Sequence, residues 1–61
     1  MPIVDIKLYD TRINEESVPK LIEKLTDAVV DCFGEGIRKD THVVVEGIPK
    51  TQWGTDGKPH G

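Results

Sequence analysis

Residues 3–8 alternate between hydrophobic and polar side chains, which is the pattern of a β-strand with one covered face. Val4, Ile6 and Leu8 fall on one side of such a strand, and Asp5 and Lys7 fall on the other. A polar turn region follows at residues 9–17. We therefore predict a first strand whose apolar face packs against another element.

The hydrophobic period then changes to three and four residues, which predicts an amphipathic helix. Its apolar stripe comprises Val18, Leu21, Ile22, Leu25, Val29, Cys32 and Phe33. Pro19 fits only in a first turn, where its missing N–H costs nothing. This favours Ser17 over Asn14 as the N-cap, or a tight turn that runs into the helix. Gly34 and Gly36 predict the end of the helix.

The segment His42-Val43-Val44-Val45 predicts a second strand, and its β-branched run indicates burial on both faces. Strand, helix and strand within this length predict an α+β fold. It consists of one β-α-β unit with parallel strands and a right-handed crossover. The tail is rich in turn residues, and Asp56-Gly57 predicts a small C-terminal hairpin. Residues 1–61 are expected to form a single domain, without an internal repeat.

Two strands and one helix leave one face of the sheet uncovered. A chain of 61 residues is marginally stable alone, and its one cysteine excludes an internal disulfide. No cluster of metal ligands stands out in the sequence. We therefore expect a homo-oligomer in which further copies of the chain cover the sheet.

Charge and hydropathy exclude several classes of partner. The net charge of −3 and the absence of a basic run argue against a nucleic-acid surface. No apolar segment is long enough to span a membrane, and Asp5 and Lys7 interrupt the stretch that a signal peptide would need. A cytoplasmic location is expected. Cys32 is expected to pack on the helix stripe, and His60 is expected to be solvated.

Pro2 follows the initiator Met1 directly. Methionine is normally trimmed when the next residue is small, which would leave a secondary amine at the N-terminus. A terminal amine titrates near ~8, and a nearby cation or burial lowers its pKa. Such a nitrogen is a usable general base. If Met1 is retained, Pro2 is an amide that only starts a strand.

These features together resemble the 4-oxalocrotonate tautomerase family of the tautomerase superfamily. The resemblance rests on the Met-Pro-Ile-Val start, an arginine after the first strand, the β-α-β order and the closing Ile-Pro-Lys-Thr-Gln-Trp-Gly of residues 48–54. It covers nearly the whole chain. It implies dimers with a four-stranded sheet, three of which form a hexamer. It also implies cofactor-free proton transfer on a small anionic organic substrate.

The resemblance assigns roles to individual residues. Pro2 matches the catalytic proline, once Met1 is removed. Arg12 matches the arginine that binds a carboxylate or carbonyl oxygen of the substrate, and we take it as catalytic and substrate-binding. Trp53 matches the aromatic residue of the pocket wall, which helps to lower the pKa of the proline.

His42 stands where the family has a second arginine, and this is a departure from the pattern. A histidine is shorter, is only partly charged near neutral pH and lacks a bidentate fork. Arg38 or Lys39 in the preceding loop are alternative sources of the missing charge. A shift of one residue in the alignment would put Thr41 in this position instead.

The preferred hypothesis is a cofactor-independent enol–keto tautomerase that acts on a small unsaturated 2-hydroxy or 2-oxo acid. Its general base would be Pro2. One alternative is another reaction of the superfamily, namely hydration, dehalogenation or decarboxylation, with Glu46 or Asp5 activating water. The other is a non-catalytic oligomeric homologue that retains Met1.

Overall fold

The structure is a computed structural model that describes residues 1–61. Its main elements are strand β1 (Ile3–Tyr9), helix α1 (Ser17–Phe33), strand β2 (His42–Ile48) and the short strands β3 (Gly54–Thr55) and β4 (Lys58–Pro59). Three short 3-10 helices, η1 (Asp10–Arg12), η2 (Glu35–Asp40) and η3 (Lys50–Gln52), connect them. The predicted β-α-β unit with a C-terminal hairpin is confirmed.

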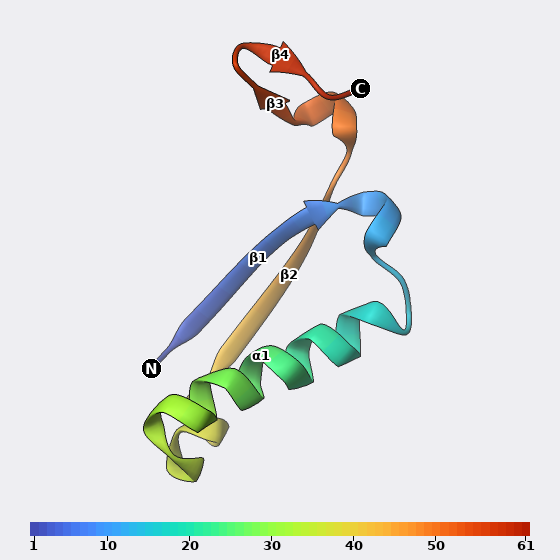
Figure 1. Ribbon diagram of the computed structural model, residues 1–61. Coiled ribbons are helices and arrows are strands. Elements are labelled where there is room, and N and C mark those ends of the chain that lie inside the picture. The colour runs from blue at the N-terminus through green and yellow to red at the C-terminus, as the bar shows by residue number, and fades with distance from the viewer.

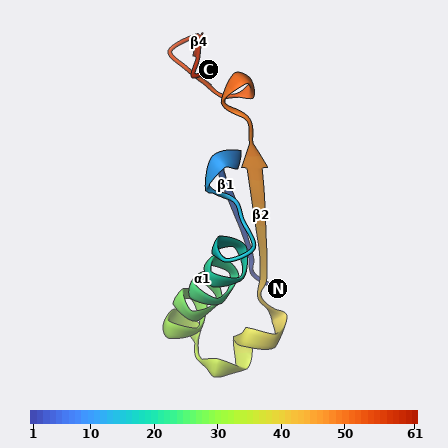
Figure 2. The same ribbon diagram turned by 90° about the vertical axis from the view of Figure 1, so that its right-hand side faces the viewer.

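Strands β1 and β2 lie side by side and run parallel, in a register that pairs Ile3 with His42 and Tyr9 with Ile48. Helix α1 lies across one face of this two-stranded sheet, and the other face is open (Figure 1, Figure 2). The predicted alternation holds in β1, where Val4 and Ile6 are half-buried and their polar neighbours are exposed. The amino ends of both strands therefore lie together, and so do their carboxyl ends.

The start of α1 is fixed by Asn14 rather than by Ser17. The Asn14 Oδ1 atom accepts hydrogen bonds from the backbone N–H groups of Glu16 and Ser17, each at 2.8 Å. Ser17 is the first helical residue, and its hydroxyl donates to the carbonyl of Arg12 at 2.9 Å. The predicted Ser17 cap is thus wrong, and the alternative of a tight turn that runs into the helix is confirmed.

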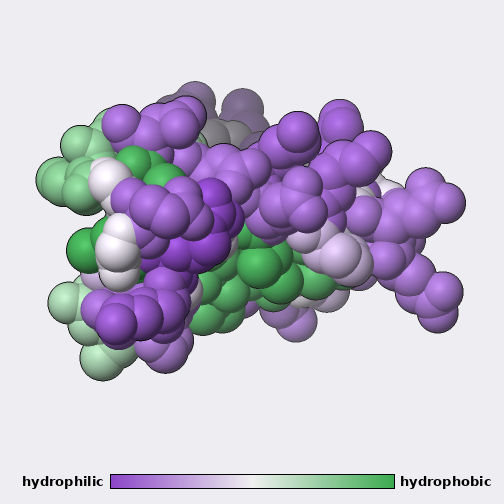
Figure 3. Space-filling view, turned by 90° about the horizontal axis from the view of Figure 1, so that it is seen from below, coloured by the Kyte–Doolittle hydropathy of each residue, from purple (hydrophilic) through white to green (hydrophobic).

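Little of the chain is buried in a single copy. Val30, at 8% exposure, is the one buried residue, whereas Phe33 is 76% exposed and Val44 is 45% exposed. Figure 3 shows hydrophobic atoms at the surface between hydrophilic ones. Burial of the second strand on both faces is therefore wrong for the isolated chain, because α1 covers only one face. Cys32, expected to pack, is exposed in the last turn of α1.

The tail forms the predicted hairpin beyond the carboxyl end of the sheet (Figure 1). Asp56 and Gly57, with φ values of 54° and 75°, occupy the left-handed region that a two-residue hairpin turn requires. Gly34, with a φ of 98°, ends α1 as predicted. None of the helices combines the length and the hydrophobicity needed to cross a membrane.

Candidate active site

The amino end of the sheet brings Pro2 and His42 together. Pro2 directly precedes β1, and its carbonyl accepts a hydrogen bond of 3.0 Å from the backbone N–H of His42. Met1 is 84% exposed, and the Pro2 nitrogen becomes a free amine only when Met1 is removed. The backbone N–H of His42 is occupied by its hydrogen bond to the Pro2 carbonyl. Its imidazole has no hydrogen-bond partner and can therefore contact a ligand near Pro2.

The carboxyl end of β1 positions Arg12, the last residue of η1. The carbonyl of Arg12 is held by the Ser17 hydroxyl, as described above. Its guanidinium is exposed, and no carboxylate of the chain forms an ion pair with it. A free guanidinium on a fixed backbone suits the binding of a carboxylate from outside the chain.

Gly47 allows the turn that carries Arg12 to pack against β2. A Cβ atom at Gly47 would lie 2.9 Å from Cγ1 of Ile13 and 3.3 Å from Cα of Asp10. These distances are shorter than ordinary carbon contacts, so only glycine leaves the turn where it is. The sequence did carry a signal for this role, because a glycine inside a strand often marks a close approach of backbone.

Trp53 lies just after η3 at the same end of the sheet as Arg12. Its indole packs edge-to-face on Tyr9, with the ring centroids 4.6 Å apart and the ring planes at 61°. Together with Lys7, Ile48, Gln52 and Gly54 it lines an open hollow of about 490 Å³. Trp53 also lines a second open hollow, of about 450 Å³, together with the residues of the hairpin.

The four predicted site residues thus form two groups within one chain. Pro2 and His42 lie at the amino end of the sheet, and Arg12 and Trp53 lie beyond its carboxyl end. The seven residues of β1, at roughly 3.3 Å each, separate the two groups by about 20 Å. A single copy of the chain therefore does not assemble the whole predicted site.

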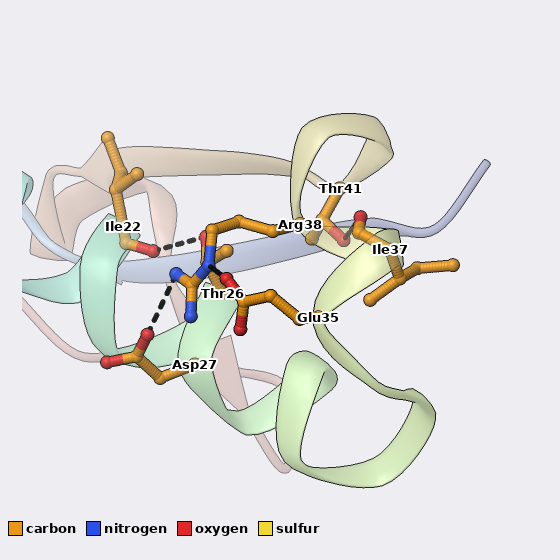
Figure 4. Close-up of polar contacts among 7 residues, drawn as sticks. All are labelled: Ile22, Thr26, Asp27, Glu35, Ile37, Arg38 and Thr41. Carbon is orange, nitrogen blue, oxygen red and sulfur yellow. Dashed lines mark hydrogen bonds and ion pairs between the residues drawn. The ribbon is translucent and has the colours of Figure 1, made fainter.

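Arg38, a candidate for the missing second arginine, is paired with two carboxylates of its own chain. Its Nε donates to Oε1 of Glu35 at 2.6 Å, and its Nη1 donates to Oδ1 of Asp27 at 2.9 Å (Figure 4). These hydrogen bonds, first to Glu35 and then to Asp27, raise the pKa of Arg38 above its ordinary value. The hydrogen bond to Asp27 joins η2 to α1, since Glu35 lies in η2 itself. Lys39 forms no ion pair.

The acidic candidates for activating water are also paired. Lys7 lies 3.4 Å from a carboxylate oxygen of Asp5 and 3.7 Å from one of Glu46, on the open face of the sheet. Neither carboxylate is therefore a free base. The structure groups no three His, Cys, Asp or Glu side chains that could hold a metal ion.

His60 is exposed, as predicted, but its side chain also makes contacts that the sequence did not indicate. Both of its ring nitrogens are hydrogen-bonded, one to the Tyr9 hydroxyl and one to the Thr55 hydroxyl. No local pattern could have predicted this contact, because 51 positions separate Tyr9 from His60.

Comparison with known proteins shows what this arrangement is similar to. The model of the tautomerase family, described as tautomerase enzyme, matches residues 2–61. The chain belongs to the tautomerase family. The match starts at Pro2 and covers both halves of the predicted site. A comparison with the curated proteins found no match.

Solved structures of other tautomerases have the same fold. A candidate 4-oxalocrotonate tautomerase from methicillin-resistant Staphylococcus aureus is 32% identical, with a TM-score of 0.83, 97% of this chain covered and 92% of the other. An isozyme of 4-oxalocrotonate tautomerase from Methylibium petroleiphilum is 29% identical, with a TM-score of 0.82 and the same coverages of 97% and 92%. The apo form of an unfused 4-oxalocrotonate tautomerase is 25% identical, with a TM-score of 0.84 and coverages of 98% and 100%.

Proposed function

We propose that this tautomerase is a cofactor-independent enol–keto isomerase whose general base is Pro2, exposed by removal of Met1. Its substrate is a small unsaturated 2-hydroxy or 2-oxo acid. The observation that carries this proposal is the position of Pro2, at the end of the sheet beside an unpaired imidazole, where the family match also begins. Residues 1–61 act as one domain.

The separation of the two groups of site residues supports a site built from more than one copy. Both strands of the two-stranded sheet have a free edge, and such edges pair readily with another strand. If two copies join antiparallel about a twofold axis, the amino end of one sheet meets the carboxyl end of the other. Pro2 and His42 of one copy then face Arg12 and Trp53 of its partner.

Exposed hydrophobic side chains support an assembly larger than this dimer. Ile3 and Val44 are 66% and 45% exposed on the open face of the sheet, and Phe33 at the end of α1 is 76% exposed. An open apolar sheet face is unfavourable in water. A hexamer of three dimers, which the resemblance to the 4-oxalocrotonate tautomerase family implies, would cover these side chains.

The proposed mechanism moves one proton. The neutral nitrogen of Pro2 removes the proton of the enol hydroxyl, the electrons shift along the conjugated system, and the prolinium returns the proton to carbon. Arg12 binds the carboxylate of the substrate and holds it in register with Pro2. The His42 imidazole stabilises negative charge as it develops on oxygen. No atoms are gained or lost, so no co-reactant is needed.

Hydration, dehalogenation and decarboxylation remain the second candidate. Hydration and hydrolytic dehalogenation would need a carboxylate that activates water, and the two acidic candidates on the sheet are both paired with Lys7. Tautomerisation requires only the amine of Pro2 as base and the guanidinium of Arg12 to bind the substrate carboxylate. The free guanidinium of Arg12 and the occupied carboxylates of Asp5 and Glu46 together favour proton transfer.

The proposal is tested first by the intact mass of the purified protein, which we expect to lack Met1. Isomerisation of a 2-hydroxydienoate is then followed by loss of its ultraviolet absorbance. The rate should rise with pH through the pKa of the prolyl amine, because only the neutral amine accepts a proton. This pKa is expected below the ~8 of an ordinary terminus, since a cation and an apolar wall both disfavour prolinium.

Variants separate the role of the amine from that of the fold. Pro2→Ala keeps a terminal amine, and we expect it to lose roughly 100-fold in kcat, the lower end of the range for a general base. A protein with Met1 retained by N-terminal formylation should lose more, because its nitrogen is an amide. Pro19→Ala, at an exposed proline in the first turn of α1, is the matched control and should be fully active. Full activity of the formylated protein would rule out Pro2 as the base.

A further inference from the structure

His60, in the tail, links the C-terminal hairpin to the end of β1. The backbone N–H of His60 donates to the carbonyl of Trp53 at 2.8 Å, which closes the hairpin. The side chain of His60 then links the hydroxyl of Tyr9, at the end of β1, to the hydroxyl of Thr55 in β3. Figure 1 shows that the hairpin otherwise projects beyond the sheet.

Three aromatic rings from three segments pack together at this link. His60 stacks on Trp53 with centroids 6.3 Å apart and ring planes at 28°. Tyr9 meets both rings edge-on, at 4.6 Å from Trp53 and 5.8 Å from His60. The Nζ atom of Lys50 lies 5.2 Å from the centroid of the Tyr9 ring. The indole of Trp53 therefore lies between contacts with the Tyr9 ring and with the His60 ring.

The residue after His60 fits against η3 so closely that only glycine is accommodated. A Cβ atom at Gly61 would lie 2.9 Å from the Cβ of Lys50 and 3.3 Å from the backbone nitrogen of Thr51. The backbone that follows His60 therefore lies close against η3. The tail is thus held at three points, namely the Trp53 carbonyl, the two hydroxyls and η3.

We propose that His60 is a positioning residue of the tautomerase, which fixes the orientation of Trp53 by bridging Tyr9 and Thr55. The inference rests on the proposed function, in which Trp53 forms a wall of the site. Without the bridge, the hairpin would hinge after β2, and the indole would leave the hollow that it lines with Ile48 and Gln52. His60 would then affect substrate binding without touching the substrate.

The hydrogen bonds of His60 to the Tyr9 and Thr55 hydroxyls can form whether the imidazole is neutral or protonated. Each hydroxyl can donate or accept, so a neutral imidazole donates from one nitrogen and accepts at the other. A protonated imidazole donates from both, and both hydroxyls then accept. Charged groups near the bridge include Lys50, whose Nζ atom lies over the Tyr9 ring, and Lys58, which pairs with Thr55 across the hairpin. The bridge is therefore made in either protonation state of His60.

Spectroscopy tests the positioning without any turnover. Trp53 and Tyr9 are the only tryptophan and the only tyrosine of the chain, so fluorescence and near-ultraviolet circular dichroism report this cluster directly. We expect His60→Ala to shift Trp53 emission to longer wavelength and to reduce the near-ultraviolet signal. Lys58→Ala, on the same hairpin, is the matched control and should leave both signals unchanged. Unchanged signals in His60→Ala would overturn the proposal.

Milder variants keep the test valid if His60→Ala does not fold. Tyr9→Phe keeps the ring and removes one hydrogen bond, and Thr55→Val removes the other. His60→Gln places an amide nitrogen near the position of Nε2 and should retain the contact with Thr55. We expect each of these variants to give a smaller spectral change than full loss of the bridge. If the Trp53 emission of Tyr9→Phe and of Thr55→Val both matches that of the wild type, the bridge does not orient Trp53.

Kinetics distinguish positioning from simple stabilisation. A net hydrogen bond corresponds to roughly a three- to tenfold change in an equilibrium, so we expect His60→Ala to raise KM by about that factor, with a smaller change in kcat. The effects of His60→Ala and Tyr9→Phe should be far from additive in the double variant, because both break the same bridge. Additive effects, or a lower kcat/KM with unchanged Trp53 spectra, would contradict the proposal.

Failure of the proposed function would look different. An inactive wild-type protein, or one whose activity does not depend on a free Pro2, would remove the tautomerase assignment and leave the spectra of the His60 variants as they are. Conversely, an active protein whose Trp53 signals ignore His60 would retain the function and lose the positioning role.

Discussion

Replacing Gly47 by alanine tests how tightly the turn that carries Arg12 is packed. The new Cβ atom would lie 2.9 Å from Cγ1 of Ile13 and 3.3 Å from Cα of Asp10. Carbon atoms in contact normally lie about 3.5–4.0 Å apart, so the Ile13 side chain must move by roughly 0.6–1 Å. The Asp10 backbone must also move by at least roughly 0.2 Å on the same scale. Both shifts displace η1 away from β2.

Overpacking of this kind costs roughly 1–3 kcal/mol. Replacing glycine also restricts the unfolded chain, which contributes about 0.4–1 kcal/mol of stability in the opposite direction. Gly36→Ala is the matched control, because its Cβ would meet nothing within 4 Å and its φ is not in the left-handed region. The two variants share the unfolded-state effect, so their difference isolates the clash at Gly47, at about 1–3 kcal/mol.

The assay is urea unfolding followed by the fluorescence of Trp53, at one fixed protein concentration because the protein is expected to be oligomeric. We expect Gly47→Ala to unfold at lower urea than Gly36→Ala. Because η1 also carries Arg12, we expect a higher KM for the substrate in Gly47→Ala and an unchanged KM in Gly36→Ala. Equal stability of the two variants would refute the close packing of η1 on β2.

Three further predictions concern charged side chains. Arg12→Ala should raise KM for a 2-hydroxydienoate by roughly 10- to 100-fold, the range for hydrogen bonds to a charged group, and an unchanged kcat/KM would remove Arg12 from the site. His42→Arg should lower KM for dicarboxylates by roughly tenfold, and no gain in a folded variant would contradict its assignment to the second arginine position. Arg38→Met should lower the unfolding midpoint, less so in high salt, since its pairs with Asp27 and Glu35 are exposed. It should leave kcat/KM intact, and a rise in KM would show that Arg38 binds substrate after all.

The backbone elements could be predicted because they depend on local patterns. The alternation of Val4 and Ile6 with polar residues predicts β1, and the three- and four-residue spacing predicts α1. Gly34 ends the helix and Asp56-Gly57 closes the hairpin because both positions require a left-handed backbone. The start of α1 was less certain, since Asn14 and Ser17 can both accept hydrogen bonds from a first turn.

The relation between the site residues depends on the tertiary structure. Family resemblance predicted the four site residues Pro2, Arg12, His42 and Trp53. Only the parallel register shows that Pro2 and His42 lie at one end of the sheet. Arg12 and Trp53 lie beyond the opposite end. This separation is why a second copy is needed to complete the site.

Side-chain partners were also beyond the reach of the sequence. The sequence left Arg38 open as a substitute for the second arginine, and only the fold shows that Asp27, 11 positions away, and Glu35 occupy it. His60 is exposed, as predicted, but its partner Tyr9 lies 51 positions away along the chain. Periodicity fixes which face a residue takes within its own element. The tertiary fold decides which residues that are distant in the sequence come into contact. Hydrogen bonds and ion pairs between side chains form only where such contacts exist.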